Sequence, residues 1–279
     1  MRVYMAVLVA VMLGLGGAAG WAYPTLGGAT GLVTLPTAEV VPAGAVDLAV
    51  DYQEVDIGAK ALGGSLGMYG EAEMLPIRAV AGVGENAEVW AAYNKVKVDP
   101  GGEDLKMWNV GGKYMIAHEE KDSASAAIGL SYGKIDNGDD ARVTTIFVVV
   151  SKSLGFGGGA GVASAKAHLG AIWMNFDSPI SEELSRPFVG LEFTGENGSI
   201  LAVEYRKRAS GIDVDTPFAA VLRYPVGGTK PLWLEVGTTN AALGGIGLDE
   251  DDVFFGLCYR FGGAAGAAAG RAPTQPWDY

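Results

Sequence analysis

The sequence predicts an all-β fold, namely an antiparallel transmembrane β-barrel of the outer-membrane type with about 12 strands. First, apolar residues alternate with small or polar ones in repeated segments, most of them about 9 to 13 residues long, which is the length a tilted strand needs to cross a bilayer. Second, the connections between these segments alternate between short turns and generally longer loops. Third, the chain opens with an apolar leader, and no later apolar run reaches the roughly 18 residues expected of a transmembrane helix.

The leader has the pattern of a secretory signal peptide over residues 1–22. Arg2 supplies the positive charge, and Val3–Leu15 forms an apolar core that is too short to span a bilayer as a helix. The small residue Ala22 predicts cleavage before Tyr23. We therefore expect export through a cleaved signal peptide to the outer membrane of a diderm bacterium.

Residues 23–44 form the next predicted unit, an N-terminal arm that Gly and Pro interrupt repeatedly. Its motif consists of Gly31, Leu32, Pro36, Thr37 and Ala38, followed by Pro42 and Gly44. This motif resembles the opening of YjbH-like outer-membrane proteins. The resemblance implies a role accessory to exopolysaccharide production and secretion. The alternative interpretation of the same segment is an arm that packs into the mouth of the barrel as a plug.

The barrel itself is expected over residues 45–261, without long helical periodicity. The twelve predicted strands are 45–53, 74–83, 87–98, 105–117, 123–133, 142–152, 160–175, 186–194, 199–207, 217–225, 231–239 and 252–261.

The connections predict which end of each strand faces outward. The generally longer, outer set is Glu54–Glu73, Asp99–Asp104, Lys134–Ala141, Ser178–Ser185, Arg208–Thr216 and Asn240–Asp251. The inner set is Gly84–Ala87, His118–Asp122, Ser153–Gly159, Gly195–Gly198 and Val226–Lys230. Short periplasmic turns and longer outer loops are typical of membrane barrels.

The last predicted strand carries apolar and aromatic residues on one face only. Its residues Gly256, Tyr259 and Phe261 resemble the C-terminal signal strand of bacterial outer-membrane barrels. That resemblance implies that the strand closes the sheet onto the first one and is read by the barrel-assembly machinery. Residues 262–279 are rich in Gly, Ala and Pro and are predicted to be a flexible tail.

Charged residues fall on the face opposite the apolar one and are therefore predicted to face the lumen, because Arg or Lys in contact with lipid near the bilayer midplane would cost about 2–4 kcal/mol. The lumen-facing charged candidates are Lys113, Lys166, Glu192, Glu204, Arg206, Arg223, Glu235 and Arg260. The same phasing adds Asp47, Asp51, Arg78, Glu88 and His168.

Two interpretations of this interior stay open. One is a water-filled passage whose charges select solutes. The other is a packed interior, in which Glu192, Glu204 and Glu235 pair with Arg206, Arg223 and Arg260 across neighbouring strands. Small inward residues favour some open space; these are Ala49, Ala127, Gly129 and Ser131.

Composition narrows the possible functions. The net charge of −12 argues against nucleic acid as a partner. The single cysteine, Cys258, excludes an intramolecular disulfide, and the two histidines, His118 and His168, lack the spacing of a zinc site. No catalytic constellation or cofactor motif is recognised, so we predict a protein that is not an enzyme and has no metal or cofactor.

The predicted partners are outer-membrane lipid and lipopolysaccharide, the barrel-assembly machinery, and polysaccharide or secretion components. The expected function is accessory to exopolysaccharide secretion or surface assembly. The alternatives are a porin-like channel for small solutes and a structural surface barrel.

Overall fold

The computed structural model describes residues 23–57, 70–99, 104–136, 141–155, 161–177, 183–207, 216–226, 231–242 and 246–262. The predicted signal peptide (residues 1–22) and all but the first residue of the predicted tail lie outside these ranges. The strands are β1 (Ala45–Ile57), β2 (Gly70–Val83), β3 (Ala87–Asp99), β4 (Leu105–Ala117), β5 (Ser125–Asp136), β6 (Ala141–Leu154), β7 (Val162–Asp177), β8 (Glu183–Gly195), β9 (Ile200–Arg206), β10 (Phe218–Pro225), β11 (Leu232–Ala242) and β12 (Ile246–Gly262).

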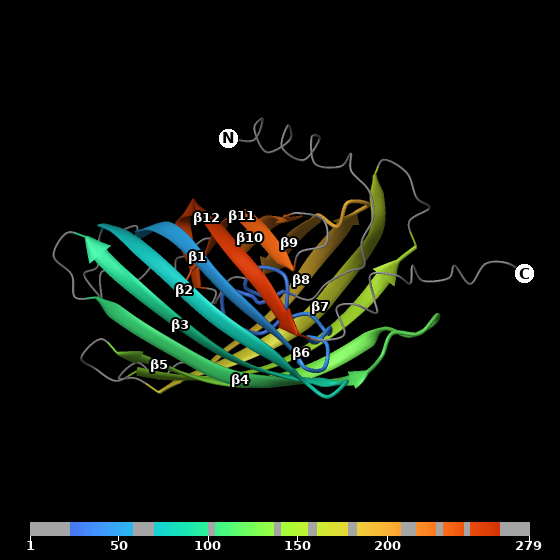
Figure 1. The fold of residues 1–279 in the computed structure, drawn as a ribbon. Coiled ribbons are helices and arrows are strands. Elements are labelled where there is room, and N and C mark those ends of the chain that lie inside the picture. The colour runs from blue at the N-terminus through green and yellow to red at the C-terminus, as the bar shows by residue number, and fades with distance from the viewer. Residues whose placement is uncertain are drawn as a thin grey trace, which may run out of the picture.

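These strands form one closed antiparallel barrel (Figure 1). Each strand pairs with its neighbours in sequence, and β1 pairs with β12 to close the sheet. At this seam Ala45 lies opposite Gly262 and Asp47 lies opposite Arg260. Closure leaves no unpaired sheet edge, which is the condition for strands to cross a bilayer. The predicted fold class is therefore confirmed.

The outer surface of the barrel carries the apolar side chains. Along β1, for example, Leu48, Val50 and Tyr52 are exposed, while the alternating Asp47, Ala49 and Asp51 are buried. Exposed aromatic residues gather toward both ends of the strands. Toward one end they are Tyr52, Tyr93, Trp108, Tyr132, Trp173 and Tyr205, and toward the other Tyr114, Tyr259 and Phe261. Two aromatic girdles that flank an apolar band are typical of outer-membrane barrels.

Among the described residues, no helix is both long enough and apolar enough to cross a membrane.

Several strands extend beyond their predicted ends. The clearest case is β12, which begins at Ile246 rather than at residue 252, while β11 continues to Ala242. The predicted outer connection Asn240–Asp251 is therefore wrong, because most of it is a strand hairpin with a register shift between Thr239 and Ala241. Ladder hydrogen bonds continue past the apolar band, whereas apolar alternation in a sequence detects only the band itself.

The N-terminal arm, which comprises residues Tyr23–Gly44, folds inside the barrel (Figure 1). It is compact, because its own backbone closes two reversals through isolated bridges between Pro24 and Thr30 and between Gly31 and Pro36. Its last hydrogen bonds tie it to the turn region at the end of β2, where the amide of Gly44 donates to the carbonyl of Gly82 at 3.2 Å. The chain then enters β1.

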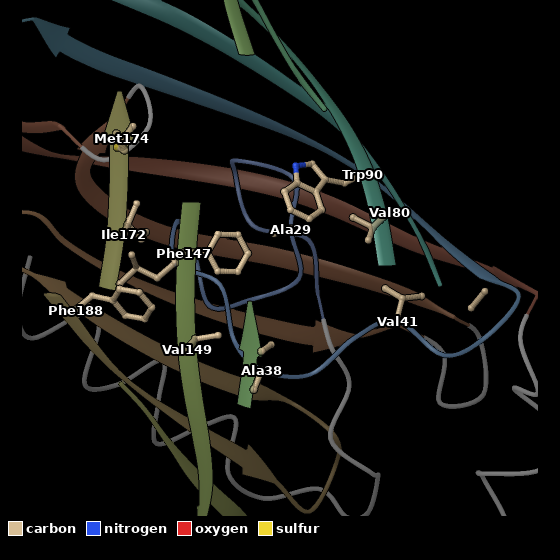
Figure 2. Packing of buried hydrophobic residues seen from close by; sticks show 13 residues of the cluster. Ala29, Ala38, Val41, Val80, Trp90, Phe147, Val149, Ile172, Met174 and Phe188 are labelled. Carbon is tan, nitrogen blue, oxygen red and sulfur yellow. The ribbon is translucent and has the colours of Figure 1, made fainter. Parts of the chain in front are cut away.

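The largest apolar cluster lies between the arm and the wall. Figure 2 shows Ala29 of the arm and Trp90 of β3 near Phe147 of β6, with Ile172 and Phe188 beyond. The rings of Trp90 and Phe147 are 6.3 Å apart. The barrel thus has a core in the ordinary sense, and the arm forms part of it.

Candidate functional site

The candidate site is the lumen, which we divide into two parts. The near rim is the end at which β1 begins and β12 ends, and the far rim is the opposite end. The near half of the lumen contains most of the buried charges and the contacts with the arm. The far half is lined mainly by apolar residues from the opposite ends of the same strands.

Glu204 of β9 binds three consecutive amides of the arm. Its carboxylate accepts hydrogen bonds from the backbone N–H groups of Val33 at 2.9 Å, Thr34 at 3.0 Å and Leu35 at 3.1 Å, and also from the Thr34 hydroxyl. Successive N–H groups that converge in this way form a concave anion-binding nest. Glu204 is 2% exposed, so its carboxylate is shielded from water and the amides of the arm supply it with hydrogen bonds.

Glu88 of β3 holds the arm at two other points. Its carboxylate accepts hydrogen bonds from the amide of Thr30 at 2.8 Å and from the amide of Val41 at 3.0 Å. Lys113 of β4 lies 3.2 Å from the same carboxylate and donates to the carbonyls of Thr30 and Thr37, each at 3.0 Å. The ion pair therefore binds both donors and acceptors of the arm backbone.

Arginines of the wall bind further carbonyls. Arg223 of β10 donates to the carbonyls of Gly31 and Leu32 and pairs with Glu235 of β11 at 3.4 Å. Its guanidinium carbon lies 4.7 Å from the ring centre of Tyr23, a cation–π contact. Arg78 of β2, which also pairs with Asp51, donates to the carbonyl of Pro24 at 3.0 Å.

Glu39 forms a side-chain ion pair between the arm and the wall. Its carboxylate lies 2.8 Å from the Lys166 ammonium of β7, and both side chains are about a quarter exposed, at 26% and 25%. Burial opposes ionisation, but attraction from Lys166 and His168 and hydrogen bonds from Lys166 and Thr37 outweigh it, and they lower the pKa of Glu39 to about 2. This pair is therefore a titratable attachment of the arm.

A Ser–His pair holds the middle of the arm. Ser151 Oγ of β6 lies 2.8 Å from His168 Nδ1 of β7 and accepts a hydrogen bond from the amide of Ala38 at 2.9 Å. Ser151 is fully buried and His168 is 2% exposed. The pair fits the arm closely, and its chemistry in this position is hydrogen bonding to the arm.

The motif residues fill sockets in the wall by shape as well as by hydrogen bonds. Leu32 is fully buried, and its Cδ1 atom lies over Gly190 of β8, where a Cβ would collide with it. Gly31 lies so close to the carbonyl of Leu35 that a Cβ there would also collide. Pro36 and Thr37 form the second reversal of the arm with Thr30 and Gly31.

All eight lumen-facing candidates lie inside the barrel. Seven of them are buried, and Lys166 is half-buried. The predicted partners are only partly right. Arg223 does pair with Glu235, but Arg260 pairs with Asp47 across the seam. Glu204 binds the arm, as does Arg206, which donates to the Thr34 hydroxyl at 3.2 Å. Glu192, 9% exposed, lies opposite Ala202 of β9 rather than opposite an arginine.

The predicted open space is also reduced. The small residue Gly129 leaves room for the ring of Phe147, and Ala49 packs in a cluster with Tyr23 and Trp233. A cavity of about 160 Å³ is found in the far half, above the arm. Small inward residues therefore accommodate larger neighbours on adjacent strands as well as open space.

Sequence reasoning missed how the arm is attached. Alternation predicts that Glu88 faces inward, but nothing in the sequence indicates that its partners are the amides of residues 30 and 41. One signal was available. A segment of 22 residues rich in Gly and Pro has many backbone groups and few side chains to satisfy them, so excess charges on the facing wall indicate where that backbone binds.

Comparisons with known proteins agree with the fold. No family model and no curated protein matches the chain. Among solved structures, the KdgM porin in complex with disordered oligogalacturonate is similar, with a TM-score of 0.53, 11% sequence identity, and coverage of 78% of this chain and 99% of that chain. The outer membrane protein Omp33 of Acinetobacter baumannii (TM-score 0.48, 7% identity, 80% and 100% coverage) and the outer membrane phospholipase A of Escherichia coli (TM-score 0.45, 8% identity, 81% and 96% coverage) are also similar.

The closed sheet, the apolar outer band and this likeness together define the class of protein. The chain is an outer-membrane β-barrel. Identities this low show the fold alone. Within the residues that the structure describes, no group of three or more His, Cys, Asp or Glu side chains is arranged to hold a metal ion.

Proposed function

We propose that this protein is an accessory barrel for exopolysaccharide secretion or surface assembly, and that its N-terminal arm keeps the lumen closed at rest. The observation that carries the proposal is the position of the motif. Among the residues that resemble the YjbH-like opening, Gly31 and Leu32 are bound by Arg223, Thr37 by Lys113 and Ala38 by Ser151, while Glu204 binds the intervening residues 33–35.

A closed lumen fits an accessory role better than free diffusion. A general porin keeps a polar, water-filled interior. Here the near half contains a folded segment whose amides and carbonyls are matched to charged groups of the wall. The outer surface of the barrel remains available for lipopolysaccharide, the assembly machinery and components of a secretion system, which we propose as partners.

A porin-like channel for small solutes is the second candidate, and one observation favours it. The fold is similar to that of the KdgM porin, whose solved complex contains oligogalacturonate, and the far half of the lumen retains a cavity. In this candidate the arm has to leave its sockets before solute passes.

The test combines a current and a polysaccharide measurement. Purified protein in planar bilayers should show no steady conductance, and cells that lack the gene should release or retain a different amount of exopolysaccharide. Restoring the gene should reverse the change. A variant with Leu32→Glu, which cannot occupy the apolar socket beside Gly190, should conduct and should fail to restore the polysaccharide.

Two results would overturn the proposal. Steady conductance of the unmodified protein, with unchanged polysaccharide in the deletion strain, would establish the channel candidate instead. Full restoration by the Leu32→Glu variant would show that the seated arm has no part in the function. The matched control is Leu191→Ala, a lipid-facing change on β8 next to Gly190. Leu191→Glu is unsuitable as a control because it would place a charge in lipid.

A further inference from the structure

The far half of the lumen contains a cavity of about 160 Å³ that the arm does not fill. Its floor is formed by the arm, including Leu26, Ala29 and Pro36. Its walls come from the far parts of several strands, and they continue to Phe176, next to the end of β7 at the far rim. The cavity therefore lies between the closed part of the lumen and the far rim.

Part of the wall of this cavity is apolar, which is unusual for a barrel lumen, because inward faces of membrane barrels are generally polar. Met107, Phe147, Ile172 and Met174 form this apolar part on β4, β6 and β7, beside polar residues of the same lining such as Asn109, Ser131 and Thr145. In Figure 2, Met174 and Ile172 lie above Phe147, on the side of the cluster opposite Trp90. Phe147 is 3% exposed, Ile172 6% and Met174 7%, so this wall is a surface suited to an apolar body.

The lining also offers, from β1 and β3, hydrogen-bonding groups that the described part of the protein leaves without partners. Gln53 of β1 is fully buried, it lines the cavity, and neither its amide nitrogen nor its amide oxygen has a hydrogen-bond partner among the described residues. Asn94 of β3 also lines the cavity, and its buried Oδ1 atom likewise has no hydrogen-bond partner among the described residues. A buried amide without partners costs about 1–3 kcal/mol, so these groups would stabilise a bound molecule that supplies them.

We propose that this cavity binds a small amphiphile, an aromatic ring or short alkyl body that carries one primary carboxamide group. The body lies against Met107, Phe147, Ile172 and Met174. The head group exchanges hydrogen bonds with the Gln53 amide, which needs both a donor and an acceptor, and donates to Asn94 Oδ1. The site is independent of the proposed role in polysaccharide secretion.

Volume and composition define the ligand class. An apolar protein cavity of about 150 Å³ holds a molecule the size of benzene. A whole lipid chain is several times larger, and a sugar unit would place its hydroxyls against the methionine and phenylalanine wall, where they would lose hydrogen bonds. The cavity is therefore suited to a free small molecule rather than to membrane lipid or polysaccharide.

The experiment uses 4-fluorobenzamide as the probe and the full-length protein in lipid nanodiscs. Fluorine NMR of the probe should show binding that saturates and that unlabelled benzamide displaces, whereas partition into lipid does neither. Cumene, a hydrocarbon of similar shape without the head group, should displace it more weakly. Met174→Trp, which fills the cavity, should weaken probe binding at least tenfold, and Gln53→Leu should weaken benzamide about tenfold while leaving cumene within twofold.

The matched control is Leu169→Trp on the same strand, a lipid-facing position that is 61% exposed, and it should leave binding unchanged. Folding of each variant is checked by its shift on a gel with and without boiling. Probe signal that never saturates in the unmodified protein overturns the proposal without any variant. Equal binding by the unmodified protein and by a folded Met174→Trp variant also overturns it.

Discussion

The near and far halves of one lumen have opposite chemistry. In the near half, Glu88, Lys113, Glu204 and Arg223 are buried and bind backbone groups of the arm. In the far half, the corresponding inward positions of β4, β6 and β7 carry residues such as Met107, Phe147 and Met174. The same strands contribute to both halves, so the difference arises within strands rather than between them.

The comparison teaches what determines the interior of this barrel. A buried segment without neighbours on either side has amides and carbonyls that must find partners, because each one left unpaired costs about 1–3 kcal/mol. The near half provides charged side chains that are long enough to reach them. The far half meets the arm only at the floor of the cavity, and packing of apolar side chains contributes more there.

The largest expected effect comes from removing the carboxylate of the nest. Glu204→Ala leaves the amides of Val33, Thr34 and Leu35 without their acceptor, so the free energy of unfolding should fall by about 5 kcal/mol and the arm should leave the lumen. Urea unfolding in vesicles measures the first change, and single-channel current measures the second.

The control for this variant is Glu196→Ala, an exposed turn residue near the same rim, which should change neither quantity. If Glu204→Ala lost stability but gave no current, the nest would stabilise the barrel without holding the lumen closed. The contrast between the halves would then be one of packing alone.

A second variant tests the far half in the same way. Phe147→Ala removes a ring that covers Gly129 and packs with Trp90, so the free energy of unfolding should fall by about 3–4 kcal/mol through cavity formation. No current should appear, because the arm keeps its charged partners. The neighbouring lipid-facing change Ile146→Ala should lower the free energy of unfolding much less, because lipid fills the space. Equal losses of stability would show that packing of Phe147 inside the barrel contributes no more than contact of Ile146 with lipid.

Particular strands and residues show which features of the structure the sequence can predict. The sequence predicts a strand at 105–117, and β4 is observed at Leu105–Ala117, because apolar alternation and flanking turns both mark its ends. The extension of β12 to Ile246 could not be predicted, since backbone pairing beyond the apolar band does not depend on side-chain pattern. Alternation correctly predicts that Glu204 lies on the inward face. It cannot identify the partner Val33, which lies 171 residues away in the sequence.

The cavity was outside the reach of sequence reasoning for a related reason. Met107, Phe147 and Met174 alternate with the lipid-facing residues of their strands, so an apolar residue on the inward face looks like an irregularity in the pattern. Only the closed barrel brings three such irregularities from β4, β6 and β7 together. Their common position becomes visible once strand register is known.

A third effect concerns acid and separates Glu39 from the buried carboxylates. The folded pKa of Glu39 is about 2, below its ordinary value of 4.5, so its contribution to stability is complete above about pH 4.5 and is lost as the pH falls toward 2. That difference corresponds to about 3 kcal/mol at most. Unfolding should be measured between pH 6 and pH 2 for the unmodified protein and for Glu39→Gln.

The difference between these two pH curves should shrink as the pH falls, because only the unmodified protein loses a charge at residue 39. Lys166→Met, which removes the partner ammonium, should reproduce the flatter curve. Two parallel curves would show that Glu39 gains nothing from Lys166, and that the arm is held by its backbone contacts alone.

The smallest expected change in stability belongs to the closing strand, where the effect should fall on assembly instead. Tyr259 and Phe261 are exposed on the outer face of β12, with their ring centres 4.4 Å apart. Phe261→Ala should therefore alter the free energy of unfolding by less than about 1 kcal/mol. If the strand is the signal read by the assembly machinery, the amount of heat-modifiable barrel in cells should nevertheless fall several-fold. Phe255→Ala, at an exposed position of the same strand, removes a similar ring outside the predicted signal and should leave that amount nearly unchanged. Equal losses from both variants would mean that lipid contact, rather than the position of the aromatic residue at the end of β12, determines assembly.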